Sequence, residues 1–378
     1  MSTLQEQSLL LHQQLRGKIT QENKVPVNTY DDLKLLYSPG VAAPCVAIQK
    51  DPELAYDYTR KGNTIAVISD GSAVLGLGNI GALASLPVME GKALLIKEFS
   101  GINAVPIVLD VQDTEQLIQT IIHLAPGFGG IHLEDISAPR CFEIEDRLAE
   151  KLDIPVFHDD QHGTAIIVLA GLINGLKIVD KQIQDVKIVL SGAGSAGFRI
   201  AELLWAYGFT NIVTFDSKGA IYTGRDNLTS QKQLLASYNT NNHAGTVLSE
   251  AVRGADVFIG VSQPNLLHAH DIAAMATDPI VFALANPDPE ISYADAKAGG
   301  ATIVATGRSD YPNQINNLSV FPGLRKGLLA KRIPKVTVDI KLKLATLLAD
   351  YVGDKLSADY IVPTVFDKNL ADMIAQRM

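Results

Sequence analysis

The chain has 378 residues and a formal net charge of −9, and 47% of its residues are hydrophobic. This length predicts two domains with substantial cores, and the acidic balance argues against nucleic acid or an anionic membrane as a partner. Cys45 and Cys141 are too few for a disulfide framework or a thiolate metal cluster. We expect a cytoplasmic globular protein with no signal peptide and no apolar stretch long enough to cross a bilayer.

The first sixty residues contain one candidate for chemistry, Tyr37. A helical leader is expected up to about residue 27, because leucines recur there at partly helical spacing. Tyr37 then precedes Ser38, Pro39 and Gly40, and proline followed by glycine favours a type II turn in which the glycine takes the positive φ. Tyr37 would stand at a rigid corner, either as a half-buried tyrosine that fastens the loop or as a site residue.

A first glycine-rich motif follows a strand predicted at 64–69. Residues 76–81 read G-L-G-N-I-G and match G-x-G-x-x-G. No acidic residue follows a second strand at the required distance, and we expect 86–91 to interrupt the helix that a dinucleotide site needs, so no cofactor is assigned to this motif. Lys92 comes just after it and begins an apolar run. It is either a solvated lysine or a base whose pKa is lowered by partial burial.

Two pairs of acidic residues each follow a predicted strand. Glu134 and Asp135 end one strand; Asp159 and Asp160 end another and precede a long helix expected after Gly163. Such pairs are often helix caps or solvated loop residues. Two of them at similar strand ends also indicate a site for Mg²⁺ or Mn²⁺, which take several oxygen ligands. The other elements expected in this α/β domain are a strand at 105–109 and helices at 114–124 and 140–152.

A second glycine-rich motif has the full context of a dinucleotide site. A predicted strand at 186–190 leads into S-G-A-G-S-A-G, a helix follows, and the next strand ends at Asp216, about 24 positions after Gly192. The glycines let the backbone approach a pyrophosphate at a helix N-terminus. Asp216 can accept from a ribose hydroxyl and would repel a 2′-phosphate, which favours NAD, although Lys218 could offset that repulsion and leaves NADP open. The residues assigned to the cofactor are Gly192, Gly194, Ser195, Ala196, Gly197, Asp216 and Asn286.

The remaining chain predicts the rest of a doubly wound sheet, with strands at 255–261, 280–285 and 302–305. Asn286 and Asn317 lie at or beyond strand ends, where ligands bind in such sheets, although amides there are often turn formers. The predicted fold class is α/β with two domains, an N-terminal α/β domain and a doubly wound Rossmann-type NAD-binding domain. The predicted limits are 1–160, 161–335 and, for C-terminal helices that pack back on the first domain, 336–378.

Together these motifs resemble the malic enzymes, particularly their compact bacterial form, over nearly the whole chain. The matching motifs are Y-S-P-G-V-A-A-P-C from Tyr37, D-G-S-A-V-L-G-L-G-N-I-G from Asp70, P-V-M-E-G-K from Pro87, H-L-E-D from His132, F-H-D-D-Q-H-G-T-A from Phe157 and Q-I-N-N-L-S-V-F-P-G from Gln314. By position, the resemblance implies metal ligands at Glu134, Asp135 and Asp160, a base at Lys92 with Asp159 beside it, an acid at Tyr37, and substrate amides at Asn286 and Asn317.

The resemblance also implies an activity: oxidative decarboxylation of (S)-malate to pyruvate and CO₂ with NAD or NADP and with Mg²⁺ or Mn²⁺. Larger members of the family place an arginine for the substrate carboxylate where this chain has Ala73, and Arg60 is our candidate for that role. The family forms dimers or higher oligomers, and a neighbouring subunit could supply Tyr37 or Lys92. Two alternatives are an oxaloacetate decarboxylase and a non-catalytic dinucleotide-binding regulator, which needs neither the acids nor Lys92.

Overall fold

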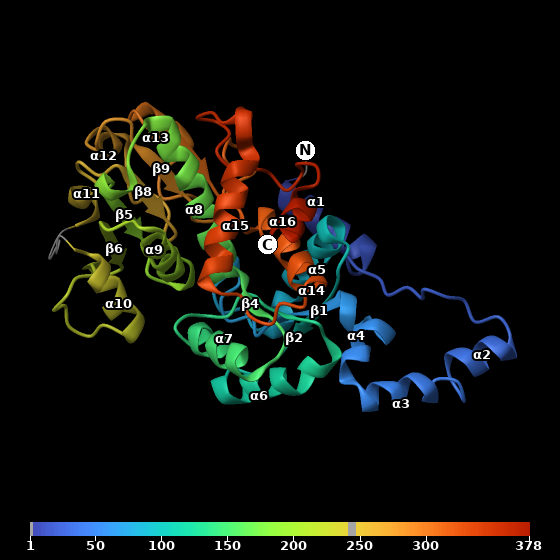
Figure 1. Cartoon of the computed structure of the whole chain (residues 1–378). Helices are drawn as coiled ribbons and strands as arrows, with labels where there is room; N and C mark the ends of the chain where they lie inside the picture. The colour runs from blue at the N-terminus through green and yellow to red at the C-terminus, as the bar shows by residue number, and fades with distance from the viewer. Residues whose placement is uncertain (1–2, 241–246) are drawn as a thin grey trace.

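The computed structural model describes residues 3–240 and 247–378, and its two parallel sheets are each covered by helices (Figure 1). The first sheet has the strand order β2-β1-β3-β4, with every pair parallel. β1 is buried along its whole length, which explains its continuous apolar sequence. The four strands are β1 (Thr64–Ser69), β2 (Asn103–Val108), β3 (Ile131–Leu133) and β4 (Val156–His158).

Three helices cover the first sheet: α5 (Ala82–Ser100), α6 (Thr114–Leu124) and α7 (Arg140–Lys151). α5 runs unbroken through Pro87, so the interruption expected at 86–91 is wrong. Its buried residues recur at helical spacing and its contacts include β1 and β2, and this packing outweighs the local cost of the proline.

The helix α8 (Asp159–Val179) connects the two sheets, and it begins earlier than expected. The sequence placed its start after Gly163, but Asp159 and Asp160 already form its first turn, where the positive end of the helix dipole favours carboxylates. By length and composition α8 could cross a membrane, so the expectation of no such stretch is wrong on that criterion. Of its most apolar window, 78% is buried inside the protein, as in a core helix.

The second sheet has the order β10-β9-β8-β5-β6-β7, and all pairs are parallel except β6 with β7. It is the doubly wound sheet that the glycine-rich fingerprint predicts, with α9 (Ser195–Tyr207) directly after the loop that follows β5. Its strands are β5 (Ile188–Ser191), β6 (Ile212–Asp216), β7 (Gly219–Ala220), β8 (Val257–Gly260), β9 (Ile280–Ala283) and β10 (Ile303–Thr306). The intervening helices are α10 (Ser230–Tyr238), α11 (Leu248–Ala251), α12 (Ala269–Ala273) and α13 (Tyr293–Ala298).

The C-terminal helices join the two halves. α14 (Phe321–Ala330) packs on α5 and on α16 (Leu370–Arg377), while α15 (Val338–Val352) packs on α8 and α9. Arg325 of α14 is fully buried and donates to the carbonyl oxygens of Ile131 and Phe157 at 3.1 Å each. α14 therefore lies against the first sheet, although the sequence placed it within the second domain.

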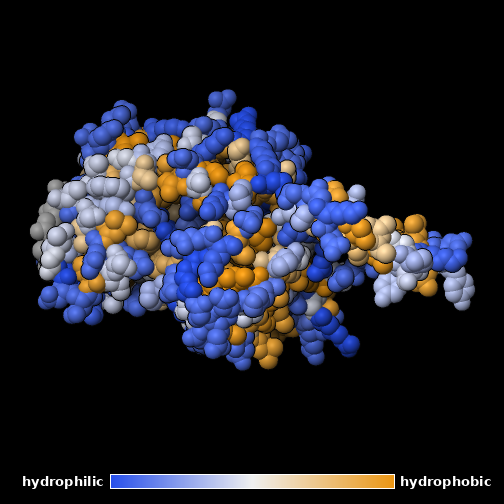
Figure 2. Space-filling model, turned by 60° about the horizontal axis from the view of Figure 1, so that its bottom comes forward, coloured by the Kyte–Doolittle hydropathy of each residue, from blue (hydrophilic) through white to orange (hydrophobic). Residues whose placement is uncertain are grey.

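The N-terminal helices α1 (Leu4–Leu15), α2 (Tyr30–Leu36), α3 (Ala42–Lys50) and α4 (Ala55–Tyr58) have no buried residue. α2 and α3 form an arm that projects from the body and carries apolar side chains (Figures 1 and 2). The leader helix ends at Leu15 rather than near residue 27. Gly40 does not take a positive φ, so the predicted type II turn is wrong; Tyr37 instead caps α2.

Candidate active site

A cleft of about 810 Å³ lies between the carboxyl ends of the two sheets. We call its two sides the acid wall, made of Lys92, Glu134, Asp135, Asp159 and Asp160, and the dinucleotide wall, made of the loop 192–197 with Ser262 and Asn286. Both walls contribute lining residues, among them Lys92, Glu134, Asp135, Asp160, Ser195, Ala196, Ser262, Asn286 and Asn317. Two residues that precede the arm, His12 and Lys18, also line the cleft.

Lys92 is the centre of the acid wall. Its Nζ lies 2.8 Å from Glu134 Oε1 and 2.9 Å from Asp159 Oδ2, and 4.5 Å from the centroid of the Phe321 ring. Burial alone would lower the pKa of Lys92, but the carboxylates of Asp159 and Glu134 outweigh it and the pKa is raised. The expected lowering by burial is therefore wrong for the site as it stands, because the sequence did not show that two acids would face the ammonium.

Three carboxylates lie together beside Lys92. One oxygen from each of Glu134, Asp135 and Asp160 can be chosen so that all lie within 4.8 Å of one another. Burial, followed by repulsion from Glu134, raises the pKa of Asp160. Buried carboxylates this close destabilise each other unless a cation lies between them, and an all-oxygen donor set suits Mg²⁺ or Mn²⁺. These residues therefore fit the expected metal.

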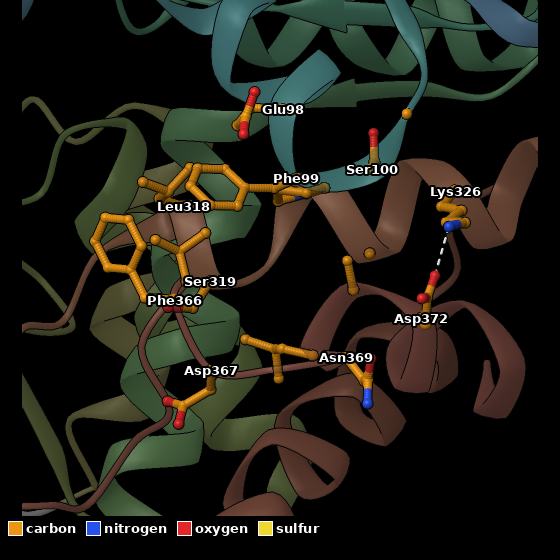
Figure 3. A pocket seen from close by; sticks show the side chains of 16 residues that line it. Glu98, Phe99, Ser100, Leu318, Ser319, Lys326, Phe366, Asp367, Asn369 and Asp372 are labelled. Atoms are coloured by element: carbon orange, nitrogen blue, oxygen red, sulfur yellow. Dashed lines mark hydrogen bonds and ion pairs between the residues drawn. The ribbon is translucent and has the colours of Figure 1, made fainter.

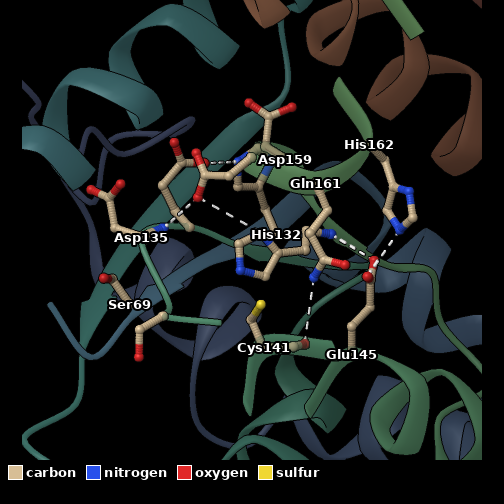
Figure 4. Close-up of polar contacts among 12 residues, drawn as sticks. Ser69, His132, Asp135, Cys141, Glu145, Asp159, Gln161 and His162 are labelled. Atoms are coloured by element: carbon tan, nitrogen blue, oxygen red, sulfur yellow. Dashed lines mark hydrogen bonds and ion pairs between the residues drawn. The ribbon is translucent and has the colours of Figure 1, made fainter. Parts of the chain in front are cut away.

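The turn that holds Asp159 and Asp160 is fixed by residues that the sequence did not single out (Figure 4). Glu145 of α7 accepts from the backbone N–H of His158 at 2.8 Å and pairs with His162 Nε2 at 2.9 Å. Arg199 of α9 donates to Gln161 at 2.9 Å. The cluster thus connects the metal turn with the dinucleotide helix. Gln161 and His162 lie within the F-H-D-D-Q-H-G-T-A motif, and that was the available signal.

The loop of the dinucleotide wall requires glycine for steric reasons. Gly192 has φ +117°, and a Cβ there would lie 2.7 Å from the carbonyl oxygen of Val261; a Cβ on Gly197 would lie 1.9 Å from the carbonyl oxygen of Gly192. At Gly194 a Cβ would meet nothing within 4 Å. The open side is where a pyrophosphate would approach the start of α9.

Asp216 ends β6 as predicted, but its carboxylate already has cationic partners. Arg225 pairs with it at 2.7 Å, Lys232 at 2.5 Å, and the backbone N–H of Lys218 donates to it at 2.9 Å. Burial would raise the pKa of Asp216, but these hydrogen bonds lower it. The charge that was expected to repel a 2′-phosphate is therefore offset by two cations.

The remaining candidates divide between the cleft and the surface. Asn286 and Asn317 both line the cleft. Tyr37 is 69% exposed on the arm and is not among the lining residues, and Arg60, in a short turn before β1, is exposed outside the cleft. Within its own chain, Tyr37 does not join Lys92.

A second cavity of about 430 Å³ lies between the C-terminal end of α5, α14 and the start of α16 (Figure 3). Phe99 and Phe366 meet edge to face beside it, with ring centroids 5.7 Å apart. Lys326 pairs with Asp372 on its lining. No cluster of metal-ligating residues is found there in the part of the chain that the structure describes.

Comparison with known proteins gives one consistent result. Residues 16–149 match the family model "Malic enzyme, N-terminal domain" and residues 161–376 match "Malic enzyme, NAD binding domain". The NAD-dependent malic enzyme of Geobacillus stearothermophilus is 51% identical, over 98% of this chain and 77% of that protein. The NADP-dependent malic enzyme of Salmonella typhimurium is 47% identical over 95% of this chain, which spans about half (49%) of it. The crystal structure of an NAD-dependent malic enzyme from Thermotoga maritima superimposes with a TM-score of 0.95 at 45% identity, covering 98% of both chains.

Proposed function

This chain belongs to the malic enzyme family, and we propose that it converts (S)-malate to pyruvate and CO₂ with reduction of NAD or NADP. The observation that carries the proposal is the cleft itself. A lysine held by two carboxylates and a three-carboxylate cation site stand opposite a dinucleotide loop, and two amides also line the cleft. Hydride transfer needs a proton acceptor and a hydride acceptor on either side of one carbon, and this arrangement supplies both positions.

Lys92 is the proposed base. Neutral Lys92 would take the proton of the C2 hydroxyl as hydride leaves C2 for the nicotinamide. In the site as it stands, Asp159 and Glu134 favour the protonated lysine. Lys92 can become neutral only if there is less negative charge around its Nζ. Binding of Glu134 to the cation would remove one of the two carboxylates from Nζ, and Asp159 would still orient the amine.

Glu134, Asp135 and Asp160 would hold the divalent cation. When bound, that cation polarises the C2 oxygen of malate and stabilises the negative charge that develops there during loss of CO₂. His132 Nε2 donates to Glu134 Oε2 at 2.8 Å and so would orient this ligand. Asn286 and Asn317 line the same cleft and can hydrogen-bond the substrate.

The last proton, delivered to C3 of enolpyruvate, is assigned to Tyr37 of a second copy of the chain. Tyr37 is exposed at the arm, and the arm carries apolar side chains that a second copy can cover (Figure 2). A twofold dimer would place each arm on the other protomer. The proposed assembly is therefore a homodimer, or a higher oligomer built from it, whose sites are completed in trans.

Mixed dimers test this assignment. Lys92→Ala should abolish hydride transfer, and Tyr37→Phe should chiefly slow conversion of enolpyruvate to pyruvate. If the tyrosine acts in trans, mixing the two impaired variants after dissociation restores about a quarter of wild-type pyruvate formation, since half of the dimers are mixed and each has one intact site. Mixing restores nothing if Tyr37 and Lys92 of the same chain work together.

The proposed dinucleotide preference is for NAD, but only by a modest factor. Asp216 supports NAD by accepting from the ribose, whereas Arg225 and Lys232 beside it would tolerate a 2′-phosphate. Relatives with either name lie at similar identity, 51% and 47%. A steady-state comparison of kcat/KM for NAD and NADP measures the preference, and Arg225→Gln should move it further toward NAD.

The activity itself is tested with malate, Mn²⁺ and NAD, read as NADH and as CO₂. We expect both products in equal amounts and neither after removal of metal by a chelator. Rapid CO₂ from oxaloacetate with no NADH from malate would favour the decarboxylase alternative. Tight dinucleotide binding with no turnover of either substrate would favour the regulator. A cytoplasmic location is a further prediction, which cell fractionation can check.

A further inference from the structure

A dicarboxylate substrate needs a second cationic contact that the acid wall does not supply. A cation held by Glu134, Asp135 and Asp160 would neutralise one carboxylate of malate, and Lys92 is already held by Asp159 and Glu134. A carboxylate brought into such an acidic cleft without a cation would lose hydration and gain repulsion. The other carboxylate therefore requires a positive group elsewhere on the lining.

Lys18 is such a group. It lies just after α1, lines the same cleft as Lys92, and its ammonium donates to the carbonyl oxygen of Pro87 at 2.7 Å. Its backbone N–H donates to Glu90 Oε2 at 3.1 Å, so the residue is fixed to α5 at two points. An ammonium has three N–H groups, and one bond to a carbonyl leaves two for a ligand.

The position of Lys18 is close to the base. A Cβ built on Gly91, the residue before Lys92, would lie 3.6 Å from Lys18 Nζ. Because Gly91 has no side chain, nothing from that residue separates the ammonium from the turn of α5 that carries Lys92. Among the described residues, no carboxylate lies within ion-pair distance of Lys18 Nζ, in contrast to Lys92.

We propose that Lys18 binds the substrate carboxylate that the metal does not hold, C4 of malate, and so selects dicarboxylates. This assignment rests on the proposed function, since it takes malate as the substrate. It replaces Arg60, which lies outside the cleft. His12 also lines the cleft, but its Nδ1 already donates to the carbonyl oxygen of Ser8 at 2.7 Å. Partial burial lowers the pKa of Lys18 against the opposing pull of Glu90, so an incoming carboxylate would restore charge stabilisation to a partly dehydrated ammonium.

The test compares two ligands in the dimeric holoenzyme with Mn²⁺ and dinucleotide. In malate two carbons separate the carboxylates, so one carboxylate can reach Lys18 while the other is at the metal. In oxalate the two carboxylates are joined directly, and both would be used by the metal. For Lys18→Met we expect KM for malate and its calorimetric Kd to rise about 10- to 100-fold, the value of a lost charged hydrogen bond. The Kd of oxalate should change less than twofold, and Lys18→Arg should recover most of the malate affinity. Lys24→Met, a matched loss of one charge on an exposed lysine of the same segment, should leave both affinities unchanged.

Each outcome decides the assignment. Unchanged malate affinity in Lys18→Met overturns it, and so does an equal loss for malate and oxalate, which would mean that the variant disturbs the whole cleft. If the wild-type chain binds malate but produces no NADH, the proposed oxidation fails while the binding comparison still tests Lys18. If the chain acts on oxaloacetate instead, the same comparison is made with the KM for that dicarboxylate.

Discussion

The two walls of the cleft are built on the same architectural position, the carboxyl ends of parallel strands, but different forces hold them. The acid wall consists of buried charges that neutralise each other, with Lys92 between Glu134 and Asp159. The dinucleotide wall is a loop in which backbone approaches backbone, and Gly197 leaves no room for a Cβ beside Gly192. The first wall should therefore fail when a charge is removed, and the second when an atom is added.

This difference determines which substitutions are informative. A buried ion pair contributes little net stability as a pair, but loss of one partner leaves an uncompensated charge in a low dielectric. A glycine loop has no charge to lose, and its sensitivity depends on a contact that no flexible side chain can relieve. The walls can thus be perturbed one at a time, since metal affinity reports on the first and dinucleotide affinity on the second.

The largest expected effect is that of Lys92→Met. The change removes the base, so malate oxidation should fall by at least about 10³-fold. It also leaves Asp159 and Glu134 without their shared cation, which should lower the free energy of unfolding by about 3 kcal/mol. NADH formation and urea denaturation without metal measure the two effects.

Metal addition sharpens this result. Mn²⁺ bound by Glu134, Asp135 and Asp160 would replace the lost positive charge, so it should stabilise Lys92→Met more than it stabilises the wild type. Equal stabilisation of both proteins by Mn²⁺ would argue that the charge of Lys92 does not interact with the three acids.

The next effect concerns the dinucleotide wall. In Gly197→Ala the new Cβ would lie 1.9 Å from the carbonyl oxygen of Gly192, so the loop must shift and dinucleotide affinity should fall by at least about tenfold. Mn²⁺ affinity should remain unchanged, because the acid wall is on the other sheet. Titration of each ligand separately measures both.

Gly194→Ala is the matched control for this loop. A Cβ there meets no atom of the protein within 4 Å, so the unfolding free energy of the variant should stay close to that of the wild type. This holds even if the added methyl group weakens the binding of a pyrophosphate. A loss of stability in Gly194→Ala as large as that in Gly197→Ala would contradict the steric account.

Local patterns were sufficient to predict the α/β class, the parallel strands of both sheets and the dinucleotide loop, because each depends on periodicity and on glycines at fixed spacing; the short antiparallel β7 was not predicted. The start of α8 was misplaced by several residues, since the pair Asp159 and Asp160 reads as a strand end until the helix dipole and the contacts of Glu145 are known. Pro87 was misread in the same way, because the packing of α5 on the sheet overrides a local signal.

The site was harder to predict wherever charge partners come from distant segments. No spacing rule indicates that Arg225 and Lys232 would form ion pairs with Asp216, or that Lys18 would line the cleft from the N-terminal segment. The raised pKa of Lys92 has the same origin, since Glu134 and Asp159 lie 42 and 67 positions away in the chain. Tyr37 illustrates the limit most clearly, because one chain alone does not bring it to the cleft.

The effect with no change in activity is a pH dependence of stability that arises behind the acid wall. Burial lowers the pKa of His162 to about 4, and Glu145, which burial would shift upward, is held at a pKa of about 2 by His162. Unfolded histidine titrates near 6.5, so between pH 6.5 and pH 4 the unfolded chain binds the extra proton and stability falls as the pH is lowered. Glu145 extends the same loss from about pH 4.5 down to about pH 2.

Urea denaturation at pH 7 and pH 5, compared between the wild type and His162→Gln, isolates the contribution of His162, on the order of 2 kcal/mol. His162→Gln retains an N–H donor for Glu145 but cannot take up the proton, so its stability should change less over this interval than that of the wild type. The buried His132, whose pKa is also lowered, contributes equally to both proteins and cancels in the difference. His123→Gln, on the exposed face of α6, is the control, and its stability should change with pH as much as that of the wild type. If the stability of His162→Gln also changes as much as that of the wild type, a neutral imidazole at Glu145 does not hold the turn that carries Asp159 and Asp160.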